Sequence, residues 1–318
     1  MQARVPVLSE RIEHRTRPAG VFQQRVAPGV LVNFEADRIV DRAGTGAREA
    51  LVFDNAHFGR VMMVDGILRS SSADEFVYHE MMSHVPLLAH GRVERVLILG
   101  GADFGLAREV LKHRYVRRVV QIESDHQTLE LARAHFAAVN ATVFEDARFE
   151  LNTTDGAQFL ATTQEHFDVV LADLPEAADM QVSPLSREFF RSARGCLAPG
   201  GLFIARICSP FLQPLAFSMG IKRLSAVYPV IASYLVPVPS AIGGPVAIGW
   251  ASNVLRPDEP STDVLASRLS NSFISTHYYT PEVHRAAFAL PQFLRNTISA
   301  ATRPDEEERV VRSFPQPG

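Results

Sequence analysis

The sequence predicts an α/β fold in which a mostly parallel sheet, covered by helices on both faces, follows a small antiparallel β-domain. After about residue 93, strand-like apolar runs alternate with helical runs, and this alternation indicates βαβ units. Before it, the runs are short and β-type. They are separated by turn formers such as Asp54-Asn55 and Asp65-Gly66, a pattern typical of hairpins.

The elements can be justified in chain order. The first β-type runs are GVLVNFE, ALVFDN and GRVMMVDGILRS. A helix is predicted over ADEFVYHEMMSHVPLLAHG, where apolar residues recur at helical spacing until Gly91, namely Phe76, Tyr78, Met82, Val85 and Leu88. The alternating pairs are RVLILGG with GLAREVLKH, RRVVQIE with HQTLELARAHFAAV, ARFELNTT with DGAQFLATT, FDVVLAD with SREFFRSARGCL, and GLFIARIC with a further helix. Two later strand runs, VIASYLVPV and PVAIGWAS, close the edge of the sheet.

These patterns divide the chain into four segments. We expect an N-terminal tail at 1–20, a small β-domain with its linking helix at 21–85, an α/β catalytic domain at 86–300, and a charged tail at 301–318.

Composition and charge narrow the class of protein. The 318 residues are 47% hydrophobic and 21% charged, as in an ordinary globular protein. The net charge of −3 gives no basic field for nucleic acid. Cys196 and Cys208 are too few for a disulfide framework or a four-cysteine metal site, so we expect a reducing compartment and no metal. No run approaches the roughly 20 apolar residues of a membrane span, so we expect a cytoplasmic protein without membrane contact.

The loop GGADFG follows the first strand of the α/β segment. A dinucleotide fingerprint needs glycine at three positions, and here Gly100 and Gly105 fit whereas Ala102 takes the middle one. The carboxylate of Asp103 would repel a pyrophosphate, so the loop favours a cationic or neutral nucleoside. The alternative is that Asp103 caps the helix that begins near Gly105.

Two further acids stand where parallel strands end, which is where ligands bind in such sheets. Glu123 ends RRVVQIE about 20 residues past the glycine loop, where an acid bonds a ribose hydroxyl. Asp155, followed by Gly156, could contact an adenine amino group, but it could equally serve only as a helix cap.

A fourth acid, Asp173, ends the apolar run FDVVLAD, with Glu176 and Asp179 close behind it. Carboxylates grouped in a cleft raise one another's pKa and can accept a proton from an ammonium group, which makes an amine nucleophilic. The alternative is a solvated acidic loop.

Together these positions resemble the spermidine synthase family, the polyamine aminopropyltransferases, over roughly residues 25 to 295. The most specific strings are DEFVYHEM and VHRAAFALP, supported by GRVMMVDG, VLILGGADFG and FDVVLAD. The resemblance implies a class I methyltransferase-like Rossmann domain after the β-domain and a homodimer or homotetramer. It also implies decarboxylated S-adenosylmethionine (SAM) as aminopropyl donor.

The resemblance also implies roles for individual residues. The loop glycines Gly100 and Gly101 would lie against the nucleoside, and Asp103 would hold the donor's amino group. Glu123 would bind the ribose, with Asp155 and Gly156 at the adenine. Asp173 would be the catalytic base, with Tyr78 and His79 facing the amine substrate.

Several positions depart from the family pattern. Arg48, Arg69 and Arg206 stand where the family usually carries glutamine. The family's Asp-x-x-Asp-Pro becomes the segment 173–177, with Glu176 at its fourth position, and a tyrosine-bearing segment that helps hold the acceptor becomes the segment 238–241.

The arginines bear on the substrate. Two like charges ~4 Å apart cost about 4 kcal/mol at an effective dielectric constant of 20. A dicationic amine would meet that cost, whereas a carboxylate would gain a bidentate partner. We therefore hypothesise that the donor or the acceptor carries a carboxylate. The alternative is that the arginines form structural ion pairs with Glu49, Asp74, Glu75 or Glu176.

The function that follows is transfer of an aminopropyl-type group from a SAM-type sulfonium donor to an amine or amino-acid-like acceptor, with release of 5′-methylthioadenosine. Alternatives that use intact SAM are amino-carboxypropyl transfer, cyclisation or lyase chemistry, and N-methyl transfer. A non-catalytic sensor of a sulfonium nucleoside or polyamine is the alternative from a different class.

Overall fold

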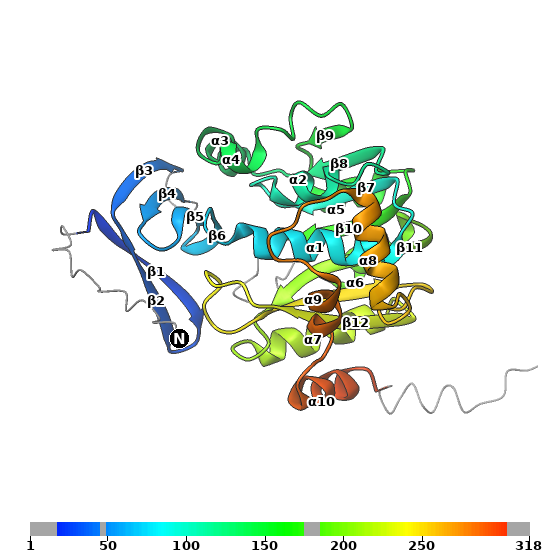
Figure 1. Ribbon diagram of the computed structural model, residues 1–318. Helices are drawn as coiled ribbons and strands as arrows, with labels where there is room; N and C mark the ends of the chain where they lie inside the picture. The colour runs from blue at the N-terminus through cyan, green and yellow to red at the C-terminus, as the bar shows by residue number, and fades with distance from the viewer. Residues whose placement is uncertain (1–17, 45–48, 175–184, 304–318) are drawn as a thin grey trace, which may run out of the picture.

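The computed structural model describes residues 18–44, 49–174 and 185–303. Two small antiparallel sheets at the N-terminal end stand beside a larger α/β unit (Figure 1). The predicted fold class is therefore confirmed. Arg48 and Glu176 lie outside the described residues, so their predicted contacts stay predictions.

The N-terminal strands form two sheets rather than the single one expected. A two-stranded sheet pairs β1 with β2, and a four-stranded meander runs in the order β3-β4-β5-β6. Asp65 and Gly66, at φ of 52° and 72°, make the predicted two-residue turn between β5 and β6. The strands are β1 (Gly20–Ala27), β2 (Val30–Ala36), β3 (Arg38–Ala43), β4 (Ala50–Asn55), β5 (Gly59–Val64) and β6 (Ile67–Ser71).

The four-stranded sheet is buried on both faces. Phe53 and Met63 face the β1–β2 hairpin, whereas Val52, Met62 and Val64 face α3 and α4 of the larger unit. Alternating residues of β4 and β5 thus pack in opposite directions, because side chains along a strand alternate between faces. This packing fixes the N-terminal sheet against the α/β unit.

The large sheet has seven strands in the order β12-β13-β11-β10-β7-β8-β9. Strands β7 to β11 run parallel, and β13 is antiparallel to both of its neighbours, so the sheet is mostly parallel as predicted. The strands are β7 (Arg95–Gly100), β8 (Arg118–Ile122), β9 (Phe149–Asn152), β10 (Phe167–Asp173), β11 (Leu197–Cys208), β12 (Val230–Val236) and β13 (Val246–Ser252).

Helices cover both faces of this sheet. Val96 and Ile98 pack with α1, α2 and α8, while Leu97 and Leu99 pack with α5, α6, α7 and α10. The predicted long helix after β8 instead breaks at Phe136, which turns inward against the N-terminal sheet. The helices are α1 (Glu75–His90), α2 (Gly105–Leu111), α3 (His126–His135), α4 (Ala137–Asn140), α5 (Gly156–Thr162), α6 (Arg187–Gly195), α7 (Pro214–Ser225), α8 (Thr262–Ser272), α9 (Pro281–Ala287) and α10 (Gln292–Ala301).

Helix α1 buries 13 of its 16 residues, and it ends at Gly91 in a left-handed cap, as the sequence predicts. It carries the charged side chain of Glu80 into the core. The two carboxylate oxygens of Glu80 accept the backbone N–H groups of His277, Tyr278 and Tyr279 at 2.7–2.8 Å. This buried carboxylate therefore fastens the loop before α9 to the centre of the molecule.

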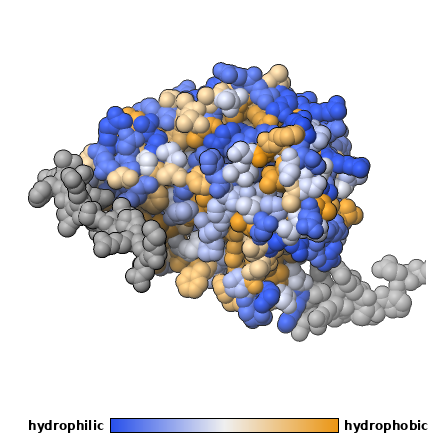
Figure 2. Space-filling model, in the orientation of Figure 1, coloured by the Kyte–Doolittle hydropathy of each residue, from blue (hydrophilic) through white to orange (hydrophobic). Residues whose placement is uncertain are grey.

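Hydrophilic residues dominate the face seen in Figure 2, with smaller apolar areas between them. Cys196 and Cys208 are both buried free thiols. In the described ranges, no helix is long and apolar enough to cross a membrane.

Glu80→Ala should lower the free energy of unfolding by at least about 3 kcal/mol, because three backbone donors lose a buried charged acceptor. Chemical denaturation measures this change. Glu130→Ala, an exposed acid on α3, is the matched control and should change stability by less than about 0.5 kcal/mol. A similar small effect at Glu80 would contradict the fastening role.

Candidate active site

A cavity of about 420 Å³ opens at the carboxyl ends of β7, β8 and β10. One wall comes from the N-terminal sheet through Met62 and Val64, and another comes from the start of α6. Nine residues selected from the sequence line this cavity together: Arg69, Gly100, Gly101, Asp103, Glu123, Asp155, Gly156, Asp173 and Arg206.

The glycine loop is shaped by the neighbouring strand. Gly100 has a φ of 83°, and a Cβ atom there would lie 2.2 Å from the carbonyl oxygen of Asp173. Only glycine permits both the backbone conformation and this close approach. The buried side chain of Gln121 donates Nε2 hydrogen bonds to the carbonyls of Gly100 and Gly101 at 2.9 and 2.6 Å. The loop is thus held from β8 and from β10.

Asp103 is buried and has two kinds of partner. Its Oδ1 accepts the N–H of Gly105, the first residue of α2, at 3.1 Å, but the N-cap residue of that helix is Phe104, so the alternative that Asp103 is the helix cap is wrong. Its Oδ2 lies 3.2 Å from Nε2 of His79. Burial disfavours the charged carboxylate, but His79 and the N–H of Gly105 outweigh it and lower the pKa of Asp103.

His79 is buried between two carboxylates. Its Nδ1 lies 2.5 Å from Oε2 of Glu75, and its Nε2 faces Asp103. Burial alone would lower the pKa of this imidazole, yet Asp103 and Glu75 raise it to about 10. A Cβ on Gly105 would lie 2.1 Å from the ring, so glycine at the start of α2 makes room for this cation.

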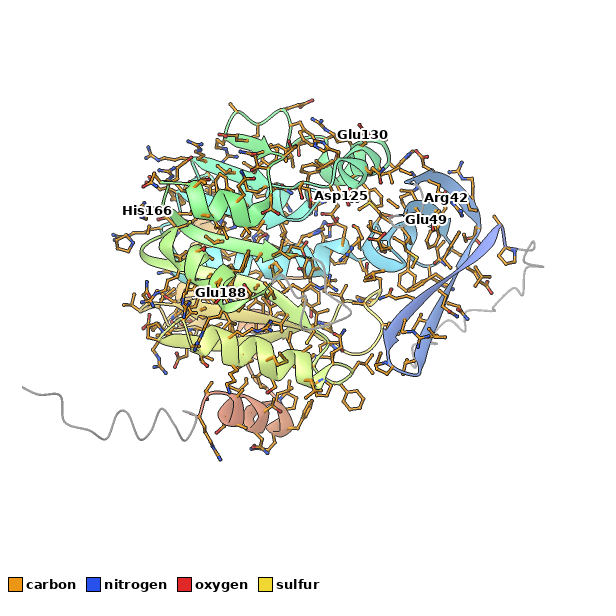
Figure 3. All side chains as sticks on the ribbon, turned by 180° about the vertical axis from the view of Figure 1, so that it is seen from behind. Arg42, Glu49, Asp125, Glu130, His166 and Glu188 are labelled. Atoms are coloured by element: carbon orange, nitrogen blue, oxygen red, sulfur yellow. The ribbon has the colours of Figure 1, made fainter. Side chains whose placement is uncertain are left out.

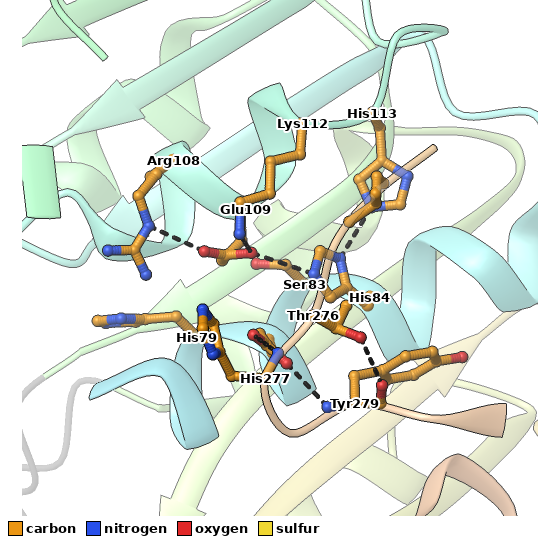
Figure 4. Close-up of polar contacts among 12 residues, drawn as sticks. His79, Ser83, His84, Arg108, Glu109, Lys112, His113, Thr276, His277 and Tyr279 are labelled. Carbon is orange, nitrogen blue, oxygen red and sulfur yellow. Dashed lines mark hydrogen bonds and ion pairs between the residues drawn. The ribbon is translucent and has the colours of Figure 1, made fainter. Parts of the chain in front are cut away.

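The ion pairs of His79 extend into a network of charged residues that runs away from the cavity. Both terminal nitrogens of Arg108 bond the Glu75 carboxylate at 2.9 and 2.8 Å, and its Nε bonds Glu109. Glu109 also pairs with Lys112 and His84 (Figure 4). Burial opposes ionisation of Glu109, but the contacts with His84 and Lys112 lower its pKa. The sequence did not indicate this network of ion pairs, because its members are spaced as ordinary helical residues.

The two acids that are predicted to contact the adenosine part of a ligand differ in their surroundings. Glu123 is half-buried, and its Oε1 accepts the N–H of Asp125 at 2.9 Å. Burial is the main cause that raises the pKa of Glu123. Asp155 caps α5 by accepting the N–H of Gln158 at 2.9 Å, and it also lines the cavity, so its predicted contact with adenine stays a prediction.

Asp173 ends β10 beside Gly100 of β7. The hydroxyl of Tyr78, on α1, donates a 2.7 Å hydrogen bond to its Oδ1. Burial first, and then the Asp173 charge, raise the pKa of Tyr78 well above its ordinary value, so the phenol keeps its proton. The tyrosine thus orients one oxygen of the carboxylate.

A second cavity of about 120 Å³ adjoins the first, and both Tyr78 and His79 line it. Arg69 and Arg206 line both cavities and so mark their junction. The guanidinium carbon of Arg206 lies 5.6 Å from the centre of the Tyr78 ring. Ser240, from the altered segment 238–241, also lines this second cavity.

Three acids were named as possible ion-pair partners of the arginines and lie among the described residues, and each contacts other groups. Asp74 accepts the N–H and the hydroxyl of Ser240 at 2.6 and 3.0 Å. Glu49 lies 3.2 Å from Arg42 on the N-terminal sheet (Figure 3). Glu75 is held by His79 and Arg108, as above.

Several lining residues were not selected from the sequence as site residues. Most carry no charged group, and some, such as Leu99 and Ala102, lie in the quoted motifs beside residues that were selected. Asp125 and Glu188, which Figure 3 labels, are two of them. The others in the larger cavity are Met62, Val64, Leu99, Ala102, Ile122, Ser124, Thr128, Ala157, Leu160, Leu174, Ser186, Phe189 and Ser192. In the part of the chain that the structure describes, no group of three His, Cys, Asp or Glu side chains is arranged to hold a metal ion.

Comparison with known proteins decides the family. The family model described as "Spermine/spermidine synthase domain" matches residues 75–259. The chain belongs to this family. It is 35% identical over 267 residues to a polyamine aminopropyltransferase of Klebsiella pneumoniae, covering 84% of this chain and 93% of the relative. It is 34% identical over 281 residues to one of Pseudomonas syringae, covering 88% and 98%.

Solved structures agree with this membership. The spermidine synthase of Thermotoga maritima matches with a TM-score of 0.81 at 28% identity, covering 91% of this chain and 99% of that one. A spermidine synthase in complex with the transition state analogue AdoDATO matches with a TM-score of 0.83, also at 28% identity and with the same coverage. The resemblance seen in the sequence is confirmed, and the chain is a transferase of this family.

The pKa of His79 predicts how stability depends on pH. The ring is protonated in the folded state up to about pH 10, whereas in the unfolded chain it titrates near 6.5. This stabilisation is complete below pH 6.5 and is lost as pH rises towards 10, by roughly 1.4 kcal/mol per unit. Denaturation between pH 7 and 9.5 should show a falling free energy of unfolding.

In His79→Gln this contribution to the slope should disappear, whereas His126→Gln, at an exposed position, should keep the wild-type slope. Equal slopes in wild type and His79→Gln would mean that the buried ring is neutral.

Glu123→Gln should weaken binding of 5′-methylthioadenosine by about tenfold or more, because a charged acceptor for ribose hydroxyls is lost. Isothermal titration calorimetry measures this affinity. Glu130→Gln, at an exposed position of α3, is the control and should bind as the wild type does. Unchanged affinity in Glu123→Gln would remove Glu123 from the nucleoside site.

Proposed function

We propose that the protein transfers an aminopropyl-type three-carbon group from a SAM-type sulfonium nucleoside to an amine and releases 5′-methylthioadenosine. The observation that carries this proposal is the Tyr78–Asp173 hydrogen bond, which links a residue of the second cavity to a carboxylate of the first. Relatives named polyamine aminopropyltransferases, and a structural neighbour bound to a transition state analogue, support it.

The larger cavity fits the nucleoside half of the donor. Its acids lie at the carboxyl ends of neighbouring strands, with Glu123 assigned to the ribose and Asp155 with Gly156 to the adenine. Gly100 and Gly101 present backbone to the ligand, and Asp103 stands where the donor's three-carbon chain begins. Decarboxylated SAM or SAM itself is the proposed co-substrate.

The reaction is an in-line displacement. The amine nitrogen attacks the carbon bonded to the sulfonium, a carbon–nitrogen bond forms, and the carbon–sulfur bond breaks with its electron pair passing to sulfur. Because the amine must be neutral to attack, Asp173 accepts the proton of the ammonium group. The sulfonium is a good leaving group, so most of the remaining rate gain comes from holding both reactants at the junction.

The acceptor occupies the second cavity in this proposal. It is a small amine or an amino-acid-like molecule, bound beside Tyr78 and His79. We further propose a cytoplasmic location, which two buried free thiols fit, and an assembly of two or four copies.

Asp173→Asn should lower the rate of methylthioadenosine release at least about 100-fold, because an amide cannot accept the ammonium proton. Single-turnover assays with a sulfonium donor measure the rate, and calorimetry with methylthioadenosine should show nearly unchanged binding. Asp168 lies at the opposite end of the same strand, where it accepts two backbone N–H groups. The control Asp168→Asn should therefore leave the rate unchanged. Wild-type turnover in Asp173→Asn would remove Asp173 as the base.

A further inference from the structure

An irregularity in β6 turns one serine towards the cavities. Met63 of β5 pairs with Leu68, but Met62 pairs with Ser70, so Arg69 is an extra residue on β6. Directly paired residues of antiparallel strands share a face, and Met62 faces the α/β unit and lines the larger cavity. Ser70 therefore faces the same way. Unbroken alternation from Leu68 would instead turn it towards the β1–β2 hairpin.

The hydroxyl of Ser70 is buried without a partner. The residue lines the second cavity and is only 4% exposed. In the described ranges its Oγ has no hydrogen-bond partner. Such atoms are uncommon, because a buried polar group without a hydrogen bond costs free energy. The other buried side-chain atoms without a partner in these ranges belong to residues that line neither cavity. The unpaired hydroxyl of Ser70 therefore coincides with the proposed acceptor site.

The other described serines that line the second cavity use their hydroxyls within the protein. Each donates a hydrogen bond to a protein oxygen at 2.7–3.0 Å. The pairs are Ser71 with the carbonyl of Phe58, Ser209 with the carbonyl of Gly243, and Ser240 with the carboxylate of Asp74. Ser70 is the exception among them, although it is adjacent to Ser71 on the same strand. Its hydroxyl is thus free for a bound molecule.

The chemistry of a hydroxyl suits an amine. A serine oxygen offers two acceptor lone pairs and one donor hydrogen. In the proposed function the second cavity holds an amine, whose N–H groups need acceptors once they leave water. His79 cannot accept them, because both of its ring nitrogens face carboxylates. The carboxylate of Glu75 is engaged by His79 and Arg108. The oxygen of Ser70 fits the role of acceptor.

We infer that Oγ of Ser70 accepts a hydrogen bond from a nitrogen of the amine acceptor and so holds that substrate in the second cavity. This inference rests on the proposed function and adds a substrate-binding residue to the same site. Because Ser70 does not line the larger cavity, its hydroxyl acts on the amine and not on the nucleoside.

Calorimetry with a panel of amines tests the inference. Putrescine, cadaverine, spermidine and ornithine are each titrated into wild-type enzyme loaded with methylthioadenosine, and the tightest binder becomes the probe. Ser70→Ala should weaken binding of the probe about fivefold or more, because the nitrogen loses its acceptor. Ser70→Cys keeps the approximate size of the side chain but is a poor hydrogen-bonding group, so it should weaken binding similarly. Affinity for methylthioadenosine should stay unchanged in both variants.

Thermal denaturation of the ligand-free protein separates this role from a structural one. Ser70→Ala should melt at or above the wild-type midpoint, because the lost hydroxyl has no protein partner. Ser233→Ala is the matched control. Ser233 is also buried, donates to the carbonyl of Ile248 at 3.0 Å and lines neither cavity. Its loss should lower the midpoint and leave the affinity for the probe unchanged.

Wild-type affinity for the probe in either Ser70→Ala or Ser70→Cys would overturn the inference. A midpoint lowered in Ser70→Ala as in Ser233→Ala would also overturn it, since the hydroxyl would then be bonded within the protein. Failure of all four amines to bind the loaded wild type would overturn it as well. The proposed function fails separately, if the probe binds but neither SAM nor decarboxylated SAM releases methylthioadenosine in its presence.

Discussion

The site depends on the ion pairs that the buried imidazolium of His79 makes with two carboxylates. The ring lies between Glu75 and Asp103, and the pKa of about 10 follows from that position. The pairing joins α1 to the glycine loop, and it requires glycine at position 105, where a side chain would strike the ring. Arg108 completes the arrangement by holding Glu75 with both terminal nitrogens, so no member of the chain is left as an isolated buried charge.

Two consecutive residues of α1 therefore hold two acids of the site in position. Tyr78 orients Asp173 and His79 holds Asp103, although the acids come from different strand ends. The N–H groups bonded to Glu80, the next residue, fasten the loop before α9 to the same helix. Because α1 is packed into the core along its length, these three contacts share one rigid support, which suits a reaction whose rate depends on positioning.

Much of this architecture could be predicted from local patterns. Alternating strand and helix runs indicated the parallel sheet, and the ends of those strands indicated that Asp103, Glu123 and Asp173 would meet. The contacts that define the chemistry could not be predicted in this way. Tyr78 and Asp173 are 95 positions apart. Asp155 is a different case, because its sequence context fits both a helix cap and a ligand contact. In the structure it caps α5 and lines the larger cavity, and the ligand contact stays a prediction.

The protonation state of His79 determines the charge that Asp103 and the second cavity present to a substrate, and it can be observed directly. Nitrogen NMR of the selectively labelled ring reports whether one or both nitrogens carry protons. At pH 8 we expect an imidazolium, protonated on both nitrogens, that titrates only near pH 10. A neutral ring at pH 8, with one unprotonated nitrogen, would contradict it.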